Sequence, residues 1–454
     1  MVKRTPLEET VLSRIRPTGE EREHIYGVAR QLLDAISASG QVQGMVVGSI
    51  ARNTWVSGEH DIDIFLLFSP TLSREMLEKQ GMTLARQIAA QFTDRFFEKY
   101  AEHPYICASI DGVGVDLVPC YAVETAIKIQ SAVDRTPFHT RYITDKINGL
   151  IDDVLLLKQF AKAGGIYGSD QMTEGLSGYL CELLVLHYGG FIPLLEAAAV
   201  WRPGTVIDIE HHAGKKFKEP LIVVDPVDPR RNVAAAVSLN RMVEFIELAR
   251  GYLDDPKEKF FTVPPHQAIT RRALAKLLNE RRTHLFAITF ATPPYIPEIV
   301  VPQLKRSTLA VCELLERNGF SVHHASFDMQ PERSMLLFEL LIAELPAIRQ
   351  HIGPPLWNRV NAGKFFEKYA TTQPLAPYIE NGRYEVEVMR EYAHAKTLLE
   401  SPHLVNTSLG RHVKQAIGQG WTVDEGVTCW REEFAAFIAD FFDRCSPLAR
   451  IRRN

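Results

Sequence analysis

The chain has 454 residues, of which 46% are apolar, and its formal net charge is −4. This length accommodates about three domains of roughly 150 residues each, and the apolar content is typical of globular proteins with buried cores. No run of 18 apolar residues occurs, which excludes a conventional membrane span, and the slightly negative charge disfavours an extended nucleic-acid-binding surface but allows a local basic groove.

The N-terminal residues and the cysteines indicate the compartment in which the protein works. The first residues include no apolar stretch of the kind found in signal peptides, so we expect a cytoplasmic protein with no membrane partner. The six cysteines are scattered and form no CxxC pair, which argues against a zinc site and against a disulfide framework. We therefore expect free and mostly buried thiols in a reducing compartment.

The first elements that the pattern predicts are a helix, a strand and a second helix. Thr18 and Glu21 have the spacing of a capping box, which predicts a helix from there to about Ser39, ended by Gly40. The apolar segment QGMVVGS predicts a strand. Farther along, the apolar spacing within residues 73–100 predicts another long helix.

Residues 46–68, VVGSIARNTWVSGEHDIDIFLLF, contain the pattern that indicates chemistry. DIDIFLLF predicts a strand, and because side chains alternate along a strand, Asp61 and Asp63 point to the same side. Two neighbouring carboxylates repel each other unless a cation holds them, and hard divalent cations prefer oxygen ligands. The backbone amides at Gly48 and the hydroxyl of Ser49 suit phosphate oxygens. The stretch therefore predicts a metal site facing a phosphate site, as in phosphoryl or nucleotidyl transfer.

A third acid follows on a later strand. The segments YICASID and GVGVDLVPCY predict two strands, and the Asp-Gly pair between them indicates a hairpin. Asp116 is the only acid in the second strand, where an unpaired carboxylate is costly because its neighbours are apolar. We therefore predict that Asp116 joins Asp61 and Asp63 as a third metal ligand. The alternative for all three is a solvated acid at a strand edge.

Mostly helical sequence follows these strands. Residues 123–140 are polar and rich in turn formers, so we predict a loop there. A helix is predicted over 145–164, and two more are separated by Gly189-Gly190. A long loop over 206–238 leads to the last helix of this block, over 239–253.

After residue 265 the pattern changes to alternating strands and helices. THLFAITF predicts a strand, QLKRSTLAVCELLERNGF a helix, and SVHHASFDM and SMLLFELLIAEL two further strands. This β-α-β-β order is typical of a small RNA-recognition-like sandwich. RYEVEVMREY predicts one more strand, and residues 393–454 predict helices that alternate with loops such as IGQGWTVDEG.

Several further residues are candidates for a phosphate or base site. Ser49 and Arg52 lie one helical turn apart, where both can meet phosphates, although they also suit a helix cap and a surface arginine. Lys158 lies in the apolar run VLLLKQF, which suits an ammonium that meets an anion or one that reaches solvent. Tyr167 can stack on a base or belong to the core. His139 lies in a predicted loop, and its pattern alone assigns it no function.

Taken together, these motifs resemble a known family. The run GSIARNTW…DIDIFLLF is similar to the signature of polymerase-β-type nucleotidyltransferases, and more narrowly to that of archaeal (class I) CCA-adding enzymes, which are tRNA nucleotidyltransferases. The resemblance is strong up to about residue 265 and looser beyond it. The segments that share the order and spacing of the family are AEHPYI, VDLVPCY, SAVDRTPFH, GGIYG, GLSGYLCELL and VVDPVDPRRNVAAAVSL.

The resemblance implies an α+β fold with four domains and a homodimer. The four domains are a polymerase-β-type nucleotidyltransferase head domain (1–142), a helical neck domain that binds nucleotide and tRNA (143–264), an RRM-like α/β body domain (265–392) and a mixed tail domain with tRNA contacts (393–454).

The resemblance also assigns roles to residues by their positions in these motifs. Catalytic carboxylates that hold Mg²⁺ fall on Asp61, Asp63 and Asp116. Residues that bind ATP or CTP fall on Ser49, Arg52, His139, Lys158, Tyr167 and Arg231, where Arg231 is preferred to Arg230 as the arginine that reads the base. These matches give His139 the function that its pattern alone did not.

One residue departs from the family pattern. The family usually has Glu-x-Asp where this chain has Asp61-Ile62-Asp63. Aspartate is one methylene shorter than glutamate, so we expect at most a modest change in metal position or preference and no loss of activity.

The implied reaction is template-independent addition and repair of the 3′-terminal CCA of tRNA. The tRNA 3′-hydroxyl, deprotonated next to a cation bound by Asp116, attacks the α-phosphate of CTP or ATP and releases pyrophosphate, so that C, C and A are added in turn. The helical and C-terminal domains would clamp the acceptor stem and TΨC arm of tRNA, mainly through backbone contacts.

Two other functions stay open from the sequence. One is another template-free RNA nucleotidyltransferase, such as a poly(A) or poly(U) polymerase, which would not stop after three additions. The other is a tRNA-binding scaffold with an inactive site, which would release no pyrophosphate in the presence of Mg²⁺.

Overall fold

The computed structural model describes residues 4–59, 61–100, 104–265, 267–371 and 376–453. Contacts divide the chain into two compact units: unit 1 is Met1–Pro265 together with Cys445–Asn454, and unit 2 is His266–Arg444. Residues 101–103 of the AEHPYI motif lie outside the described residues. All six cysteines are free and four are buried, which confirms the prediction for the thiols.

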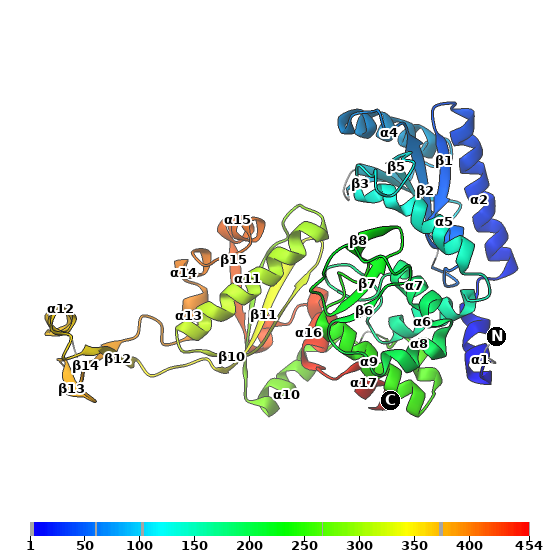
Figure 1. The fold of residues 1–454 in the computed structure, drawn as a ribbon. Helices are drawn as coiled ribbons and strands as arrows, with labels where there is room; N and C mark the ends of the chain where they lie inside the picture. The colour runs from blue at the N-terminus through cyan, green and yellow to red at the C-terminus, as the bar shows by residue number, and fades with distance from the viewer. Residues whose placement is uncertain (1–3, 60, 101–103, 266, 372–375, 454) are drawn as a thin grey trace. The chain divides into compact units, whose positions relative to one another are not determined.

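The first part of unit 1 is a five-stranded sheet with the strand order β1-β2-β5-β4-β3 (Figure 1). Strands β2 and β5 are parallel, whereas the other neighbours are antiparallel. Apolar side chains of the strands share one core with α2 and α4. The elements are α2 (Gly19–Ala38), β1 (Gln43–Val47), α3 (Gly48–Arg52), β2 (Asp61–Phe68), α4 (Arg74–Ala89), β3 (Phe96–Tyr100), β4 (Pro104–Ile110) and β5 (Val113–Tyr121).

The predicted strand DIDIFLLF is confirmed, and so is the hairpin of β4 and β5. The predicted helix over 73–100 is wrong in its last part, because β3 pairs with β4 and its backbone groups therefore bond within the sheet. In the predicted capping box, the Thr18 hydroxyl accepts the amide of Glu21. The Glu21 carboxylate accepts hydrogen bonds from Ser57 and Trp55 as well as from the backbone of Thr18.

The second part of unit 1 is mostly helical and surrounds its own apolar core. Its elements are α1 (Pro6–Ile15), η1 (Ala132–Arg135), α5 (Thr136–Lys146), α6 (Ile151–Ala163), α7 (Gly178–Tyr188), α8 (Phe191–Ala198), β6 (Thr205–Ile207), β7 (Leu221–Asp225), β8 (Asp228–Asn232), α9 (Leu239–Asp254) and η2 (Glu258–Phe261).

Several predictions for this helical part need correction. The predicted loop over 123–140 contains the start of α5, whose first turn holds Pro137, so His139 lies on a helix. The predicted helix over 145–164 begins only at Ile151, after a turn in which Gly149 has φ +84°. The predicted loop over 206–238 contains β7, a buried apolar strand that pairs with β6 and β8. The helix break at Gly189-Gly190 is confirmed.

No single helix in the described part of the chain is long and apolar enough to cross a membrane. Helices α7 and α8 reach the required length and composition only together, but they are bent by 92° at the break between them. Most of their apolar side chains belong to the core of the helical part.

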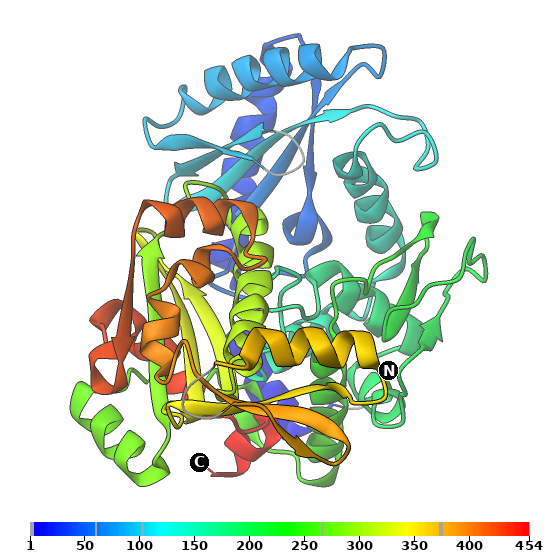
Figure 2. The same cartoon turned by 90° about the vertical axis from the view of Figure 1, so that its left-hand side faces the viewer.

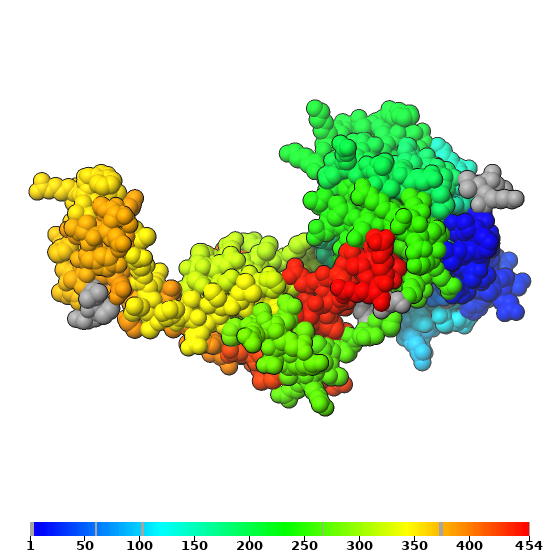
Figure 3. Space-filling model, turned by 90° about the horizontal axis from the view of Figure 1, so that it is seen from below, coloured from blue at the N-terminus to red at the C-terminus, as the bar shows by residue number. Residues whose placement is uncertain are grey.

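The last helix, α17 (Pro447–Arg453), packs against α9 and belongs to unit 1. Gly251 of α9 makes room for it, because a Cβ added there would lie 2.3 Å from Leu448 Cδ1. The red atoms of this segment lie on the surface in Figure 3. The last residues of the chain thus complete the core of unit 1.

Unit 2 contains an antiparallel four-stranded sheet with the order β10-β11-β9-β15, and α11 runs along it (Figure 2). The predicted β-α-β-β order is confirmed, but IGQGWTVDEG is not all loop, because β15 pairs with β9. The elements of this part are α10 (Arg271–Arg281), β9 (His284–Ala291), α11 (Pro297–Arg317), β10 (Ser321–Met329), β11 (Arg333–Ile342), α13 (Ala395–Leu399), α14 (Pro402–Val405), α15 (Arg411–Gln419), β15 (Trp421–Glu425), η3 (Gly426–Cys429), η4 (Glu432–Phe434) and α16 (Ala435–Phe442).

A second, three-stranded sheet with the order β12-β14-β13 also belongs to unit 2. The predicted strand RYEVEVM is confirmed as β14. The elements are β12 (Ile348–Pro355), α12 (Arg359–Tyr369), β13 (Tyr378–Glu380) and β14 (Arg383–Met389).

Candidate active site

The three predicted metal ligands lie on the two parallel strands of the first sheet. Asp63 on β2 is directly opposite Asp116 on β5, and Asp61 is opposite Gly114. Neighbouring strands lie about 4.8 Å apart, so Asp63 and Asp116 are close together on the same face. Ile62 is fully buried on the opposite face, which confirms the predicted alternation along the strand.

Two glycines leave space for these carboxylates. A Cβ at Gly48 would lie 2.2 Å from Asp63 Oδ2, and a Cβ at Gly114 would lie 2.2 Å from Asp61 Oδ1. No side chain fits at such distances unless the carboxylate moves. Gly48 also has φ +73°, a conformation that glycine adopts without strain. The glycine of the GSIAR segment therefore leaves the space that the Asp63 carboxylate of β2 occupies.

The three acids repel one another. Burial, together with the negative charge of Asp116, raises the pKa of Asp63 to about 7, and burial also raises the pKa of Asp116. Among the described residues, no three His, Cys, Asp or Glu side chains are gathered closely enough to form a finished metal site. Three carboxylates on one sheet face nevertheless have the oxygen chemistry that divalent cations prefer, provided that they turn toward a common ion.

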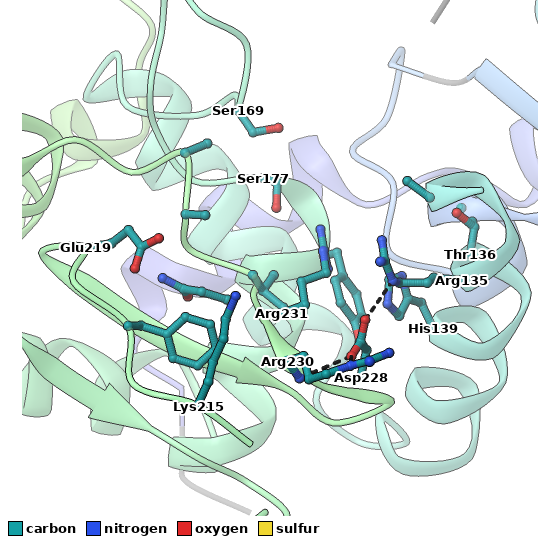
Figure 4. Close-up of a pocket in the computed structure, with 18 of the residues that line it drawn as sticks. Arg135, Thr136, His139, Ser169, Ser177, Lys215, Glu219, Asp228, Arg230 and Arg231 are labelled. Atoms are coloured by element: carbon teal, nitrogen blue, oxygen red, sulfur yellow. Dashed lines mark hydrogen bonds and ion pairs between the residues drawn. The ribbon is translucent and has the colours of Figure 1, made fainter. Parts of the chain in front are cut away.

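A cavity of about 820 Å³ opens beside this sheet face, between the two parts of unit 1 (Figure 4). Gly48 and Arg52 line it from the side of the sheet, and His139, Tyr179 and Arg231 line it from the helical part. The charged residues of its wall are mostly basic: Arg52, Arg135, Lys215, Arg230 and Arg231, with Glu219 and Asp228 as the acids. Such a wall suits a ligand that carries negative charge.

Asp225, at the end of β7, holds two of the predicted nucleotide-binding residues. Its Oδ2 accepts hydrogen bonds from His139 Nε2 at 2.9 Å and from Arg231 Nη1 at 2.8 Å. Burial opposes ionisation, but the bonds from His139 and Arg231 outweigh it and lower the pKa of Asp225 to about 2. Burial lowers the pKa of His139, so the ring is neutral at pH 7 and donates through Nε2. The ring of Tyr179 stacks on that of His139, with 4.1 Å between the centroids.

Arg230 and Arg231 differ in their surroundings. Arg230 is the more exposed side chain, and its Nε lies 3.7 Å from Asp228 Oδ1, whereas Arg135 pairs with Asp228 Oδ2 at 3.0 Å (Figure 4). Arg231 is held by Asp225 in the same bond network as His139. The better-fixed guanidinium is therefore that of Arg231.

A second buried acid, Glu182 of α7, lies between Arg52 and Lys158. Arg52 Nε is 2.9 Å from Glu182 Oε2, and Lys158 Nζ is 3.8 Å from Glu182 Oε1. Lys158 Nζ also donates to the backbone carbonyl of Thr54 at 2.6 Å. The Lys158 side chain is buried, so it does not reach solvent, which was the alternative interpretation of this lysine. Burial also lowers its pKa.

The remaining candidates lie beside the cavity. A Cβ added at Gly178 would lie 3.1 Å from the Tyr167 hydroxyl and 3.5 Å from Lys158 Nζ, so both groups approach the start of α7. There Ser177 caps the helix and lines the cavity. Ser49 is half-buried on the short helix α3 and follows the cavity residue Gly48.

Sequence reasoning missed the two buried acids and the stacked tyrosine of this site. Glu182 and Asp225 each stand in an apolar run, LCELL and LIVVD, where a charge needs a partner. The same argument that singled out Asp116 would have singled them out. Tyr179 carried no such signal, because a tyrosine among apolar residues is ordinary.

The fold and the site together define a class. A family model described as "Nucleotidyltransferase domain" matches residues 29–139, which include all three carboxylates, and one described as "tRNA nucleotidyltransferase, second domain" matches residues 152–262. The chain is therefore a nucleotidyltransferase. A third model, "CCA-adding enzyme, C-terminal domain", matches residues 281–426.

Comparison with known proteins narrows this class to a family. A CCA-adding enzyme of Methanoregula boonei is 66% identical over 99% of this chain and 98% of its own length. One of Methanosarcina barkeri is 41% identical over 92% of this chain and 93% of its own length. The chain belongs to the family of CCA-adding enzymes. A crystal structure of the Cid1 poly(U) polymerase is 16% identical, with a TM-score of 0.45, over 57% of this chain and 98% of that chain.

Proposed function

We propose that this protein adds and repairs the 3′-terminal CCA of tRNA, using CTP and ATP and no nucleic-acid template. The observation that supports it most is the sheet face with Asp63 opposite Asp116 beside a basic cavity, in a chain of the CCA-adding family. The carboxylates suit the reacting phosphate, and the cavity suits the nucleotide.

We propose that Asp61, Asp63 and Asp116 bind divalent cations, with Mg²⁺ as the ion. The space left by Gly48 and Gly114 and the all-oxygen donor set fit such ions. Two bound cations would lower the pKa of the attacking 3′-hydroxyl and neutralise the departing pyrophosphate.

The residues around the cavity would bind and orient the nucleotide. Arg52 offers charge to the triphosphate, with Ser49 beside it and with Lys158 and Tyr167 near the start of α7. His139 and Arg231, fixed by Asp225, would meet the ribose or base. We propose that Arg231, rather than the more exposed Arg230, reads the base, because a fixed guanidinium discriminates between hydrogen-bonding patterns better than a mobile one.

We further propose that the acceptor stem and TΨC arm of tRNA lie along the helical part of unit 1 and along unit 2, and that the protein works in the cytoplasm as a homodimer. The division into head, neck, body and tail domains stays a prediction. These proposals rest on the family resemblance.

The test is a primer-extension gel. Purified protein and Mg²⁺ are mixed with a tRNA transcript that ends at the discriminator base, and CTP, ATP or both are added. We expect two added nucleotides with CTP alone and three with both. A long ladder from one nucleotide would indicate a poly(A) or poly(U) polymerase. Bound tRNA without extension would indicate an inactive scaffold.

Asp225→Asn should weaken nucleotide binding. Asparagine keeps the shape but loses the charge that holds His139 and Arg231, so we expect the Kd for CTP and ATP to rise about tenfold. Isothermal titration without tRNA measures this directly. Asp424→Asn is the matched control, because it disturbs an Asp–Arg pair with Arg431 in unit 2 and should leave both Kd values unchanged. Equal effects of the two variants would contradict the role given to Asp225.

A further inference from the structure

Glu182 carries a charge where charges are costly. It lies on α7, and its side chain has no exposed surface. Removing a carboxylate from water costs several kcal/mol, and good hydrogen bonds to opposite charges are needed to offset that cost. The partners of Glu182 therefore indicate why an acid stands here.

These partners come from two separate segments of unit 1. Arg52 Nε, on α3, donates to Glu182 Oε1 at 3.1 Å, and the hydroxyl of Thr54 donates to the same oxygen. Lys158 on α6 approaches Oε1 to 3.8 Å and donates to the backbone carbonyl of Thr54. One carboxylate thus ties the sheet part of unit 1 to two helices of the helical part.

Arg52 connects this buried cluster to the cavity. Its guanidinium lies 6.0 Å from the ring centroid of Tyr179, and both residues line the cavity. Arg52 and Lys158 both approach this single carboxylate, and the charge of Arg52 also acts on Asp63, where it opposes the rise in pKa that burial causes. A guanidinium held in this way is ready for an anionic ligand and loses little freedom when the ligand binds.

We propose that Glu182 is a positioning residue of the nucleotide site, which fixes the Arg52 guanidinium in the cavity wall and holds Lys158 behind it. The proposal rests on the proposed function for the identity of the ligand, a nucleoside triphosphate. Glu182 itself does not line the cavity and acts only through Arg52 and Lys158. Its loss should therefore affect nucleotide binding and leave tRNA binding alone.

Glu182→Gln is the first test. Glutamine keeps the size and can still accept hydrogen bonds from Arg52 and Thr54, but it lacks the charge. We expect the Kd and the apparent KM for CTP and ATP to rise about tenfold, while the KM for tRNA changes less than about twofold. A residue that served folding alone would not separate the two substrates in this way.

Thr54→Val is a milder second variant that acts on the same carboxylate. It removes the hydroxyl that donates to Glu182 without entering the cavity wall. We expect a rise of about threefold in the nucleotide Kd. In the double variant with Glu182→Gln, the rise in the nucleotide Kd should be smaller than the product of the two single rises, because both substitutions act on one contact network.

Unit 2 offers a matched control. Glu339 on β11 is equally buried and accepts hydrogen bonds from Arg281 Nε at 2.7 Å and from the Thr283 hydroxyl at 2.6 Å. Glu339→Gln disturbs the same chemistry in a unit that contributes no residue to the cavity wall. We expect it to lower Tm and leave the nucleotide Kd unchanged.

The measurements use the full chain, with CTP and Mg²⁺ titrated in the absence of tRNA. A folded Glu182→Gln protein that binds CTP within about twofold of the wild type would overturn the proposal. An equal rise in Kd for Glu182→Gln and Glu339→Gln would also overturn it, in favour of general destabilisation. If Glu182→Gln does not fold, an unchanged Kd in Thr54→Val overturns it instead. Wild-type protein that binds CTP but never extends tRNA would refute the proposed function alone, and the Kd values would still decide on Glu182.

Discussion

Asp63→Asn is expected to lower nucleotidyl transfer by at least about 10³-fold and to leave tRNA affinity within about twofold. The asparagine has the same shape but no charge, and Asp63 is the acid that β2 places directly opposite Asp116. Asp116→Asn should have a similar effect, because both acids share the proposed cations. Single-turnover extension with saturating CTP measures transfer, and filter binding measures tRNA affinity.

Asp111→Asn is the control for this experiment. Asp111 is an exposed aspartate at the turn between β4 and β5 of the same sheet, with φ +48°, which asparagine tolerates. It should transfer nucleotides at the wild-type rate. Retained turnover in Asp63→Asn or Asp116→Asn would refute the proposed metal site.

Asp63→Asn should also change the stability of the protein in a pH-dependent way. Burial and Asp116 raise the pKa of Asp63 to about 7, above its value in the unfolded chain. The metal-free fold therefore loses stability as pH rises from about 4, the pKa of the unfolded chain, to about 7, the pKa of folded Asp63. This loss is absent below about pH 4, where Asp63 is protonated in both the folded and the unfolded state. We expect metal-free Asp63→Asn to melt above the wild type at pH 8 and level with it at pH 4. A lower Tm at pH 8 would contradict the repulsion among the acids.

Gly48→Ala is expected to reduce transfer by about 10²-fold or more, although no functional group is removed. The added Cβ would lie 2.2 Å from Asp63 Oδ2, so the carboxylate must move away from its position opposite Asp116. The backbone is also strained, because Gly48 has φ +73°. The measurement is the single-turnover rate together with Tm.

Gly58→Ala separates these two causes. Gly58 has a similar φ of +78°, but a Cβ there would meet nothing within 4 Å. It should therefore lose stability through backbone strain and keep its rate of transfer. If both alanine variants lose the same activity, the contact between Gly48 and Asp63 is not what matters.

The sequence allowed prediction of the sheet face that carries the three carboxylates, because its signal is local. The alternation of acids and apolar residues in DIDIFLLF predicts which side chains share a face, and it holds for any strand with one buried side. The placement of Asp116 followed from the cost of a lone charge on an apolar strand, and the parallel pairing of β2 with β5 confirms its position beside Asp63.

The basic cavity was harder to predict, because long-range contacts build it. Asp225 meets His139 across 86 residues, and Glu182 meets Arg52 across 130. Periodicity and spacing carry no information at such separations. The family resemblance identified His139 and Arg52 but gave no hint of the buried acids that hold them.

Two of the wrong predictions concern strands at the edges of sheets. β3 and β15 are each an outermost strand of their sheets, but β3 was predicted as part of a helix and β15 as part of a loop. An edge strand has one partner, so its own sequence needs little of the apolar pattern that marks central strands. The neighbouring strand, β4 or β9, decides its conformation.

The path of the chain affects the order in which its parts fold during synthesis. The chain leaves unit 1 after Pro265 and returns to it at Cys445, so unit 2 is an insertion. On the ribosome all of unit 2 emerges before α17 can cover Gly251 and fill the last place in the core of unit 1. Unit 1, which carries the three carboxylates, therefore matures last, and a nascent chain arrested before Leu448 should carry a finished unit 2 and an incomplete unit 1.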